Sequence, residues 1–190
     1  MKRFKLLGIS GSIREQSYNS AILQTLSKAV ADIADMDIFP LNDVPLYNQD
    51  TDLDPALPAV AALRTAIRDA DGLVIASPEY NFGVSGVLKN ALDWASRPYG
   101  ASPLVGKPVL TLTSSPAFTG GARAQAQLTE TLIGCAARIV LRPQAVVASV
   151  HEKVRDGELV DETTLNFLKV GVMDLIKDIP VTGTVTIQET

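Results

Sequence analysis

Three short apolar runs, each followed at once by a segment of small and polar residues, constrain the fold of this chain most strongly. The apolar runs and their polar segments cover residues 4–9 and 11–20, 72–76 and 78–83, and 108–113 and 114–123. A short apolar run bounded by turn residues is typical of a strand buried on both faces of a parallel sheet. Loops that follow such strands gather at one edge of the sheet, where ligands bind. We therefore expect a ligand site built from these three loops.

The rest of the chain alternates between strand-like and helix-like patterns. Apolar residues at helical spacing predict helices over residues 22–33, 59–69, 84–95, 124–135 and 165–179, and shorter apolar runs predict strands over residues 37–39 and 145–148. This alternation indicates a flavodoxin-like, doubly wound α/β fold, with a five-stranded parallel sheet in the order 2-1-3-4-5 and helices on both faces. We expect a single domain over residues 1–190, with a long connection over residues 42–58. Residues 181–190 alternate like a strand, with an edge strand or a frayed end as the alternatives.

Composition narrows the classes of function. The chain of 190 residues has a net charge of −4 and a sequence pI of about 5.0, whereas a binder of nucleic acid or of an anionic membrane would be basic. No apolar run approaches the ~20 residues that span a bilayer. Residues 1–10 lack the apolar region and cleavage site of a signal peptide. We therefore expect a cytoplasmic protein that binds a small molecule.

The single cysteine and the single histidine give no sign of metal or nucleophilic chemistry. Cys135 lies at the apolar end of a predicted helix, and we interpret it as a small buried residue. His151 lies in a polar stretch, without evident partners for a metal site or a catalytic triad, and we expect it at the surface. We predict no metal and no catalytic side chain, so that a cofactor carries the chemistry.

The loop over residues 11–20 has the groups that bind a phosphate. The N-terminus of the following helix would supply unpaired N–H groups and a partial positive charge, Gly11 permits a tight turn, and Arg14 adds a cation. The loop lacks the Gly-Lys-Ser/Thr of a P-loop and the Gly-x-Gly-x-x-Gly of a dinucleotide site. A mononucleotide such as FMN, with one terminal phosphate, therefore fits better. An ordinary N-cap made of serine and asparagine is the alternative at this point.

The second and third loops have features that suit a planar ring. Pro78 stiffens the exit from a strand, and the backbone N–H groups of residues 80–81 could meet the N5 and O4 edge of a flavin. Gly120 and Gly121 allow a close backbone approach and open a helix, whose N–H groups could stabilise negative charge at the N1 and O2 edge. Tyr80 or Phe82 could pack on the ring system. Alternatively, Tyr80, Phe82 and Trp94 belong to the core or to an interface, which we favour for Trp94.

Four motifs together are distinctive: Gly11-Ser12-x-Arg14-x-x-Ser17-x-Asn19, Pro78-Glu79-Tyr80-Asn81, Leu88-Lys89-Asn90-Ala91-Leu92-Asp93-Trp94 and Gly120-Gly121-x-Arg123-Ala124-Gln125. With them, about residues 3–180 of the chain resemble the NAD(P)H-dependent FMN reductase family, in the branch of chromate and quinone reductases and azoreductase-like enzymes. The resemblance implies bound FMN, NADPH or NADH as the electron donor, and a homodimer or homotetramer with the flavin near a subunit interface.

The resemblance also implies which residues hold the cofactor. The FMN phosphate is expected at Ser12, Arg14, Ser17, Asn19 and Ser20. The isoalloxazine ring is expected between two groups of residues, namely Pro78, Glu79, Tyr80 and Asn81 on one side and Ser114, Gly120 and Gly121 at the other edge.

The mechanism that we expect is a two-step, ping-pong exchange of two electrons. The nicotinamide passes a hydride to flavin N5 and leaves, and a quinone, an azo compound, chromate or free flavin then takes up the electrons. This chain has Ser85 where relatives usually have proline, and Phe82 and Ala126 where some chromate-reducing relatives have tyrosines at a tetramer contact. These departures weaken the expectation of chromate reduction and of the same tetramer.

Two other classes of protein with this fold are the alternatives. A flavodoxin-type electron carrier would bind FMN without nicotinamide turnover, but such carriers tend to be strongly acidic, and this chain has a net charge of only −4. A receiver-type signalling domain would need an acidic cluster after its first strand, where this chain has Gly11-Ser12-Ile13-Arg14.

Overall fold

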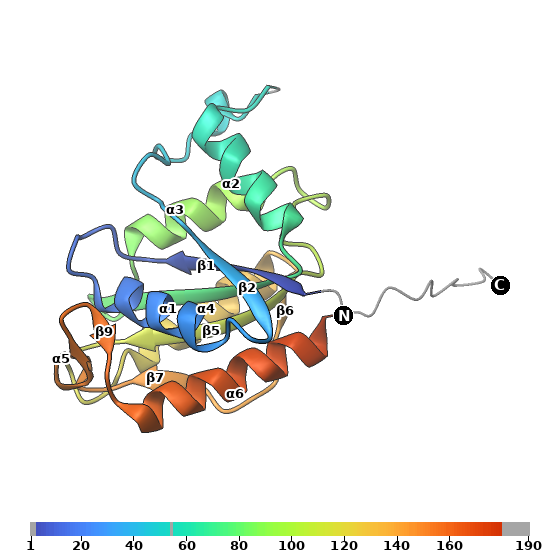
Figure 1. Ribbon diagram of the computed structural model, residues 1–190. Helices are drawn as coiled ribbons and strands as arrows, with labels where there is room; N and C mark the ends of the chain where they lie inside the picture. Colours follow the sequence, from blue (N-terminus) through green and yellow to red (C-terminus); the bar gives the residue numbers. More distant parts are fainter. Residues whose placement is uncertain (1–2, 54, 180–190) are drawn as a thin grey trace.

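A twisted, mainly parallel sheet forms the middle layer of the protein, with helices on both of its faces (Figure 1). The computed structural model describes residues 3–53 and 55–179. The strands of this sheet are β1 (Phe4–Ser10), β2 (Ala34–Phe39), β3 (Gly72–Tyr80), β4 (Gly83–Val84), β5 (Pro108–Ser114), β6 (Arg138–Ile139) and β7 (Ala145–Val147). The helices are α1 (Tyr18–Ala29), α2 (Pro58–Asp69), α3 (Gly86–Ala95), α4 (Ala122–Gly134), α5 (Val150–Lys153) and α6 (Glu162–Asp178), with a short 3-10 helix, η1 (Gln49–Thr51).

The core lies on both faces of the sheet, because successive strand residues point in opposite directions. Leu6 of β1 packs with α1 and α6 on one face, and its neighbour Leu7 packs with α2, α3 and α4 on the other. Val74 and Ile75 of β3 divide in the same way, and all four side chains are buried. This two-sided burial explains why the central strands read as continuous apolar runs in the sequence.

The order of the central strands agrees with the α/β fold predicted from the sequence. The strands run β2-β1-β3-β5 in parallel, so the flavodoxin-like fold class is confirmed. The fifth position differs in detail from the prediction, because two short strands share it. β6 pairs with Pro108 and Val109 at the start of β5, and β7 pairs with the end of β5 from Leu112 onward. Between β6 and β7 the chain contains Pro143, which cannot donate a ladder hydrogen bond.

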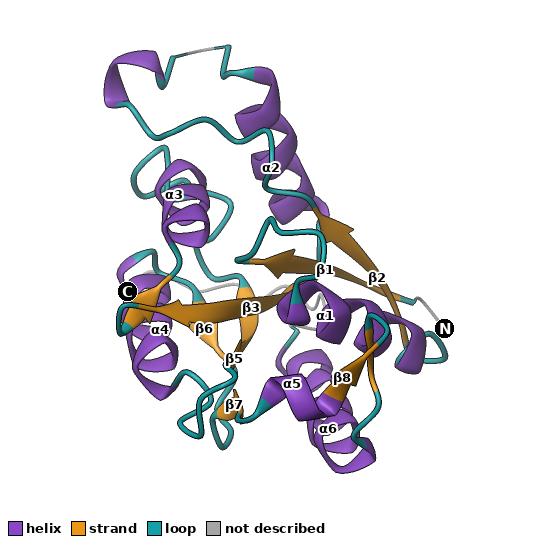
Figure 2. Ribbon diagram, turned by 90° about the vertical axis from the view of Figure 1, so that its left-hand side faces the viewer, coloured by secondary structure: helices purple, strands orange, loops and turns teal. Residues whose placement is uncertain are grey.

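Several short elements are absent from the sequence prediction. β4 pairs antiparallel with the end of β3, so the sheet is not purely parallel. A hairpin of β8 (Val154–Arg155) and β9 (Glu158–Leu159) packs beside α1, in a region for which the sequence predicted no element (Figure 2). The strand pattern noted over residues 181–190 lies outside the described residues. In the described part of the chain, no helix is long and apolar enough to cross a membrane.

Trp94 fastens the long connection before α2 to helix α3. The side chain is fully buried, its Nε1 donates to the carbonyl of Pro45 at 2.8 Å, and its ring meets the ring of Tyr47 edge-on at 4.9 Å. Asn90 of α3 donates to the same carbonyl and accepts from the backbone N–H of Tyr47. The expectation that Trp94 is a core residue is therefore confirmed, and the connection is held at Pro45 and Tyr47, although most of its other residues are exposed.

The single cysteine and the single histidine occupy ordinary positions. Cys135 is half-buried rather than fully buried as expected, because it ends α4 at the surface, and burial raises the pKa of its thiol. His151 is exposed, as predicted.

Replacing Trp94 with phenylalanine tests this attachment. Trp94→Phe removes the hydrogen bond to Pro45 and part of the buried ring, so the free energy of unfolding should fall by about 1–3 kcal/mol. Urea unfolding measures this change, and limited proteolysis should cut residues 42–57 faster. Glu130→Ala is the control, because Glu130 is exposed on α4 and the change should stay within about 0.5 kcal/mol. Equal stability of both variants would contradict the anchoring role.

Candidate functional site

The three polar loops meet at the carboxyl ends of β1, β3 and β5. β3 pairs in parallel with both β1 and β5, so the loops that follow these strands are neighbours. They enclose a cleft of about 320 Å³, a size common for small-molecule sites. The residues predicted from the sequence that line this cleft are Ser12, Arg14, Ser17, Asn19, Pro78, Glu79, Tyr80 and Ser114.

One end of the cleft is suited to an anion. Ser17 is the N-cap of α1, and its hydroxyl accepts the backbone N–H of Ser20 at 3.2 Å. The N–H groups of Tyr18 and Asn19 belong to the first helical turn, where N–H groups have no partner within the helix. The Arg14 guanidinium lies 4.9 Å from the Tyr18 ring centroid, and no ion pair joins it to a carboxylate of the described residues. These donors and this cation fit the terminal phosphate of FMN.

Hydrogen bonds to β3 and to the start of α3 hold the loop that carries these groups. The backbone N–H of Gly11 donates to the carbonyl of Ala76 at 2.7 Å, and the Ser85 hydroxyl donates to the carbonyl of Gly11 at 2.6 Å. A Cβ atom on Gly11 would lie 2.9 Å from Ser85 Oγ, so only glycine allows this approach. The hydroxyl of Ser85, at the position where relatives usually have proline, thus ties the start of α3 to the phosphate loop.

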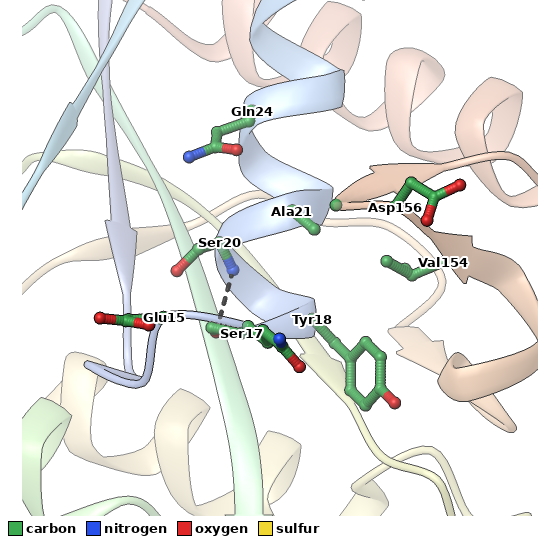
Figure 3. Close-up of a pocket in the computed structure, with 10 residues that line it drawn as sticks. Glu15, Ser17, Tyr18, Ser20, Ala21, Gln24, Val154 and Asp156 are labelled. Carbon is green, nitrogen blue, oxygen red and sulfur yellow. Dashed lines mark hydrogen bonds between the residues drawn. The ribbon is translucent and has the colours of Figure 1, made fainter.

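Ser20 faces a second cavity rather than the cleft. Its hydroxyl donates to Ser10 Oγ at 2.9 Å, which orders the end of β1. Figure 3 shows Ser20 with Ser17 and Tyr18 at one wall of this cavity, opposite Asp156 of the β8–β9 hairpin. The second cavity measures about 380 Å³ and has acidic groups, Glu15 and Asp156, in its lining. Ser20 is therefore placed to support the phosphate loop, with its hydroxyl already used inside the protein.

Glu79 connects the second loop to the third. Its Oε2 accepts the backbone N–H groups of Arg123 and Ala124, both at 3.0 Å. Gly121, the N-cap of α4, has no side chain to do this, so Glu79 caps the helix from the neighbouring strand. A carboxylate at this position also interacts favourably with the helix dipole. Glu79 therefore lines the cleft and at the same time fixes the start of α4.

Gly120 and Gly121 pack against protein, and their positive φ angles of 63° and 89° suit glycine. A Cβ atom on Gly120 would lie 2.9 Å from the backbone nitrogen of Ala148, and one on Gly121 would lie 3.0 Å from Cβ of Thr113. The N–H groups of Arg123 and Ala124, which follow in α4, donate to Glu79. That the start of this helix stabilises negative charge at the N1 and O2 edge of a flavin stays a prediction. This pair of glycines shapes the third loop by allowing close packing.

The remaining predicted residues lie at the ring end of the cleft. Ser114 Oγ donates to Oδ1 of Asn19 at 3.1 Å, and both side chains are buried, so this bond joins the end of β5 to α1. Asn81 occupies the two-residue turn between β3 and β4, with φ of 47°, directly after Tyr80. Tyr80 lines the cleft with a 54% exposed ring.

Sequence reasoning missed several residues of this site. Tyr18, Ser115 and Pro116 also line the cleft. Their positions within the recognised loops were a usable signal, because Tyr18 directly follows Ser17, and Ser115 and Pro116 directly follow Ser114. The capping bond from Glu79 had no such signal, since its partners lie more than forty residues away in the chain.

The cap can be tested by replacing Glu79 with alanine. Glu79→Ala leaves two N–H groups of α4 without a protein partner, so the free energy of unfolding should fall by about 1–3 kcal/mol. FMN binding should also weaken, because the third loop loses its fixed position. Urea unfolding of the apoprotein and fluorescence titration with FMN measure the two effects. Glu130→Ala, an exposed change on the same helix, is the control. Unchanged stability and FMN affinity would show that the bonds from Glu79 neither stabilise α4 nor position the third loop.

Comparison with known proteins agrees with this geometry. A model of the NADPH-dependent FMN reductase family matches residues 4–152. A quinone reductase of Escherichia coli K12 is 39% identical over 171 residues, covering 88% of this chain and 90% of the relative. An NAD(P)H-dependent FMN reductase of Pseudomonas aeruginosa is 42% identical over 159 residues, covering 83% and 85%. The structure of FerB, a flavoenzyme NAD(P)H:(acceptor) oxidoreductase from Paracoccus denitrificans, is 31% identical, with a TM-score of 0.82 over 93% of this chain and 97% of FerB.

These findings confirm the resemblance noted in the sequence, and with it the expected FMN cofactor, the NAD(P)H electron donor and the oxidoreductase activity. They favour an enzyme over the electron carrier and the signalling domain that share this fold. The matched relatives cover most of this chain, and this chain covers most of each of them. The chain belongs to the NADPH-dependent FMN reductase family.

Proposed function

We propose that this protein is an NAD(P)H:quinone oxidoreductase that holds FMN in the cleft at the carboxyl ends of β1, β3 and β5. The observation that carries the proposal is the convergence of a phosphate-type helix N-terminus, with Arg14 beside it, and the Tyr80 loop on one cleft. Relatives from Escherichia coli and Pseudomonas putida are named quinone reductases, and one from a Burkholderia species is named a 2-hydroxy-1,4-benzoquinone reductase. Azo compounds, chromate and free flavin are the other acceptors to be compared with quinones.

We assign the cleft residues to two roles. The phosphate is bound by the group at the start of α1, namely Ser12, Arg14, Ser17 and Asn19. The ring lies against the loop after β3, namely Pro78, Glu79, Tyr80 and Asn81. Ser114, which also lines the cleft, and the turn at Gly120 and Gly121 close the other edge of the ring, while Ser20 supports the phosphate loop through its bond to Ser10.

FMN bound in this cleft would supply the two-electron chemistry between NAD(P)H and the acceptor. The overall reaction consumes NAD(P)H, one proton and the quinone, and yields NAD(P)⁺ and the hydroquinone. The contribution of the protein is therefore orientation, which places both substrates in turn at one site. None of the cleft residues has to act as a nucleophile, because the cofactor carries the chemistry.

We also propose a homodimer or homotetramer. Large apolar side chains are exposed in the single chain, among them Tyr99 at 88%, Phe118 at 87% and Leu141 at 98%. Exposed apolar groups of this size are common at subunit interfaces. Light scattering of the purified protein measures the mass in solution, and a monomer would exclude this part of the proposal.

The function is tested by the visible spectrum of the FMN-loaded protein, recorded without oxygen before and after addition of NADPH. We expect the flavin bands to bleach, and a quinone added afterwards to restore them while hydroquinone forms in equal amount. Bound flavin that neither NADPH nor NADH bleaches would indicate an electron carrier. If chromate or an azo dye restores the flavin bands faster than any quinone does, the acceptor belongs to that class of compound and not to the quinones.

Arg14→Ala tests the position of the phosphate. Loss of a charge-assisted contact with a phosphate should weaken FMN binding by about tenfold or more, because such bonds contribute about 1.5–3 kcal/mol. The ratio of NADPH to NADH turnover should not change, since Arg14 lies at the phosphate end of the cleft. Fluorescence titration of the apoprotein with FMN provides the dissociation constant, and Arg155→Ala is the matched control on an exposed strand. Equal FMN affinity of both variants would exclude Arg14 from the phosphate site.

A further inference from the structure

We propose that the hydroxyl of Ser85 is a positioning group for the FMN phosphate, and that it helps this protein to bind FMN more tightly than riboflavin, the same flavin without a phosphate. The inference rests on the proposed function, which places FMN in the cleft. Ser85 does not itself line the cleft. It acts through the loop after β1, and it therefore adds a residue from a distant part of the chain to the phosphate site.

The Ser85 side chain is buried, with a relative exposure of 2%, and it begins α3 as the N-cap. Its Oγ accepts the backbone N–H of Leu88 at 3.3 Å and donates to the carbonyl of Gly11 at 2.6 Å. The bond to Gly11 is at the short end of the range for a hydroxyl donor. A hydroxyl has a single proton, and here that proton is committed to the phosphate loop.

The bond from Ser85 fixes the direction of the Ser12 N–H group. The carbonyl of Gly11 and the N–H of Ser12 belong to one planar, trans peptide unit, so they point in opposite directions. Holding the oxygen toward α3 therefore turns the N–H away from α3. The Ser12 N–H makes only a long bond of 3.3 Å, to Ser10 Oγ, and Ser12 lines the cleft. It is thus available to a phosphate oxygen, and a hydrogen bond on the carbonyl of the same peptide strengthens it as a donor.

The loop after β1 is held at its two ends, whereas residues 13–16 between them are exposed. At one end, Ser17 caps α1. At the other end, Gly11 lies between β3 and α3, because its N–H donates to a carbonyl of β3 at 2.7 Å and a Cβ atom on it would meet Cβ of Leu88 at 3.1 Å. Leu88 is a fully buried core residue of α3. Ser85 therefore connects this end of the loop to a rigid element.

The effect of Ser85 on flavin binding is expected to be confined to the phosphate. FMN and riboflavin share the isoalloxazine ring and the ribityl chain, and they differ only in the terminal phosphate. We assign the ring to the loop after β3, whereas Ser85 bonds to the loop after β1. Hydrogen bonds to a charged oxygen are strong and depend on geometry, and a donor that is fixed before binding costs less entropy. Without the hydroxyl, the phosphate must order the loop as it binds, so FMN loses affinity and riboflavin does not.

The test is the dissociation constant of the apoprotein for each of the two flavins, measured by flavin fluorescence. In Ser85→Ala, the dissociation constant for FMN should rise about fivefold, whereas that for riboflavin should change by less than about twofold. Ser96→Ala is the matched control, because it removes another bond from a serine hydroxyl to a carbonyl, that of Asp93 at 2.8 Å, at the other end of α3. Neither dissociation constant should change in this control.

Two further variants separate the hydroxyl from the shape of the side chain. Ser85→Cys keeps a similar volume with a weaker donor, so its FMN affinity should lie between those of the unmodified protein and Ser85→Ala, and it provides the comparison if Ser85→Ala does not fold. Ser85→Pro introduces the residue that relatives usually have, and the φ angle of −59° at this position suits proline. Proline has no hydroxyl, so this variant should lose FMN affinity as Ser85→Ala does. Full FMN affinity in Ser85→Pro would overturn the inference.

Three other results would overturn it, and only the last would also affect the proposed function. Equal losses of affinity for both flavins in Ser85→Ala would show that Ser85 supports the whole cleft rather than the phosphate. A lower melting temperature with both dissociation constants unchanged would make Ser85 a helix cap alone. Unmodified apoprotein that binds the two flavins equally well would remove the phosphate site itself, and with it the proposed placement of FMN.

Discussion

The parallel pairing of β3 with β1 on one side and β5 on the other is the constraint on which the rest of the structure depends. It brings three loops together that are separated by dozens of residues in the sequence. It also requires both faces of these strands to be buried, which the alternation of Leu6 with Leu7 and of Val74 with Ile75 provides. The buried core and the open cleft are therefore two results of one strand arrangement, since the same strands that pack the interior end at the site.

Adjacent loops alone do not make a rigid site, and long-range hydrogen bonds of two side chains supply the rigidity. The carboxylate of Glu79 fixes the start of α4 to the loop after β3. The hydroxyl of Ser85 fixes the start of α3 to the loop after β1 through Gly11. Each bond uses a side chain from one loop region to satisfy backbone groups of another. A cofactor that contacts all three loops therefore meets a surface whose parts are already fixed relative to one another, which lowers the entropy lost on binding.

The sequence was sufficient for the fold and for most of the cleft, because both depend on local patterns. Apolar runs predicted the central strands, and the small and polar residues after them predicted the loops. The Asp156-Gly157 pair was also a signal for the β8–β9 hairpin, since both residues have the positive φ angles that such turns require, but the surrounding strands of two residues each were too short to notice. The shared fifth strand position was hidden for the same reason.

Interactions between distant residues could not be predicted in this way. Nothing near Glu79 in the sequence indicates that its partners are Arg123 and Ala124, and nothing near Trp94 indicates the carbonyl of Pro45. Both contacts exist only after the sheet has placed their elements side by side. The sequence therefore indicated which residues line the cleft, but it did not indicate which distant backbone groups their side chains bond to.

Phe82 and Arg123 break local rules at adjacent points of the same surface. A bulky residue at positive φ and a cation at the N-terminal end of a helix are each unfavourable alone, and neither is offset by burial or by an ion pair among the described residues. Elsewhere in the cleft, strain and charge do have compensation, as the glycine pair of the third loop and the capped carboxylate of Glu79 illustrate. Locally unfavourable choices that the single chain does not require are expected where a ligand or a second subunit completes the interaction.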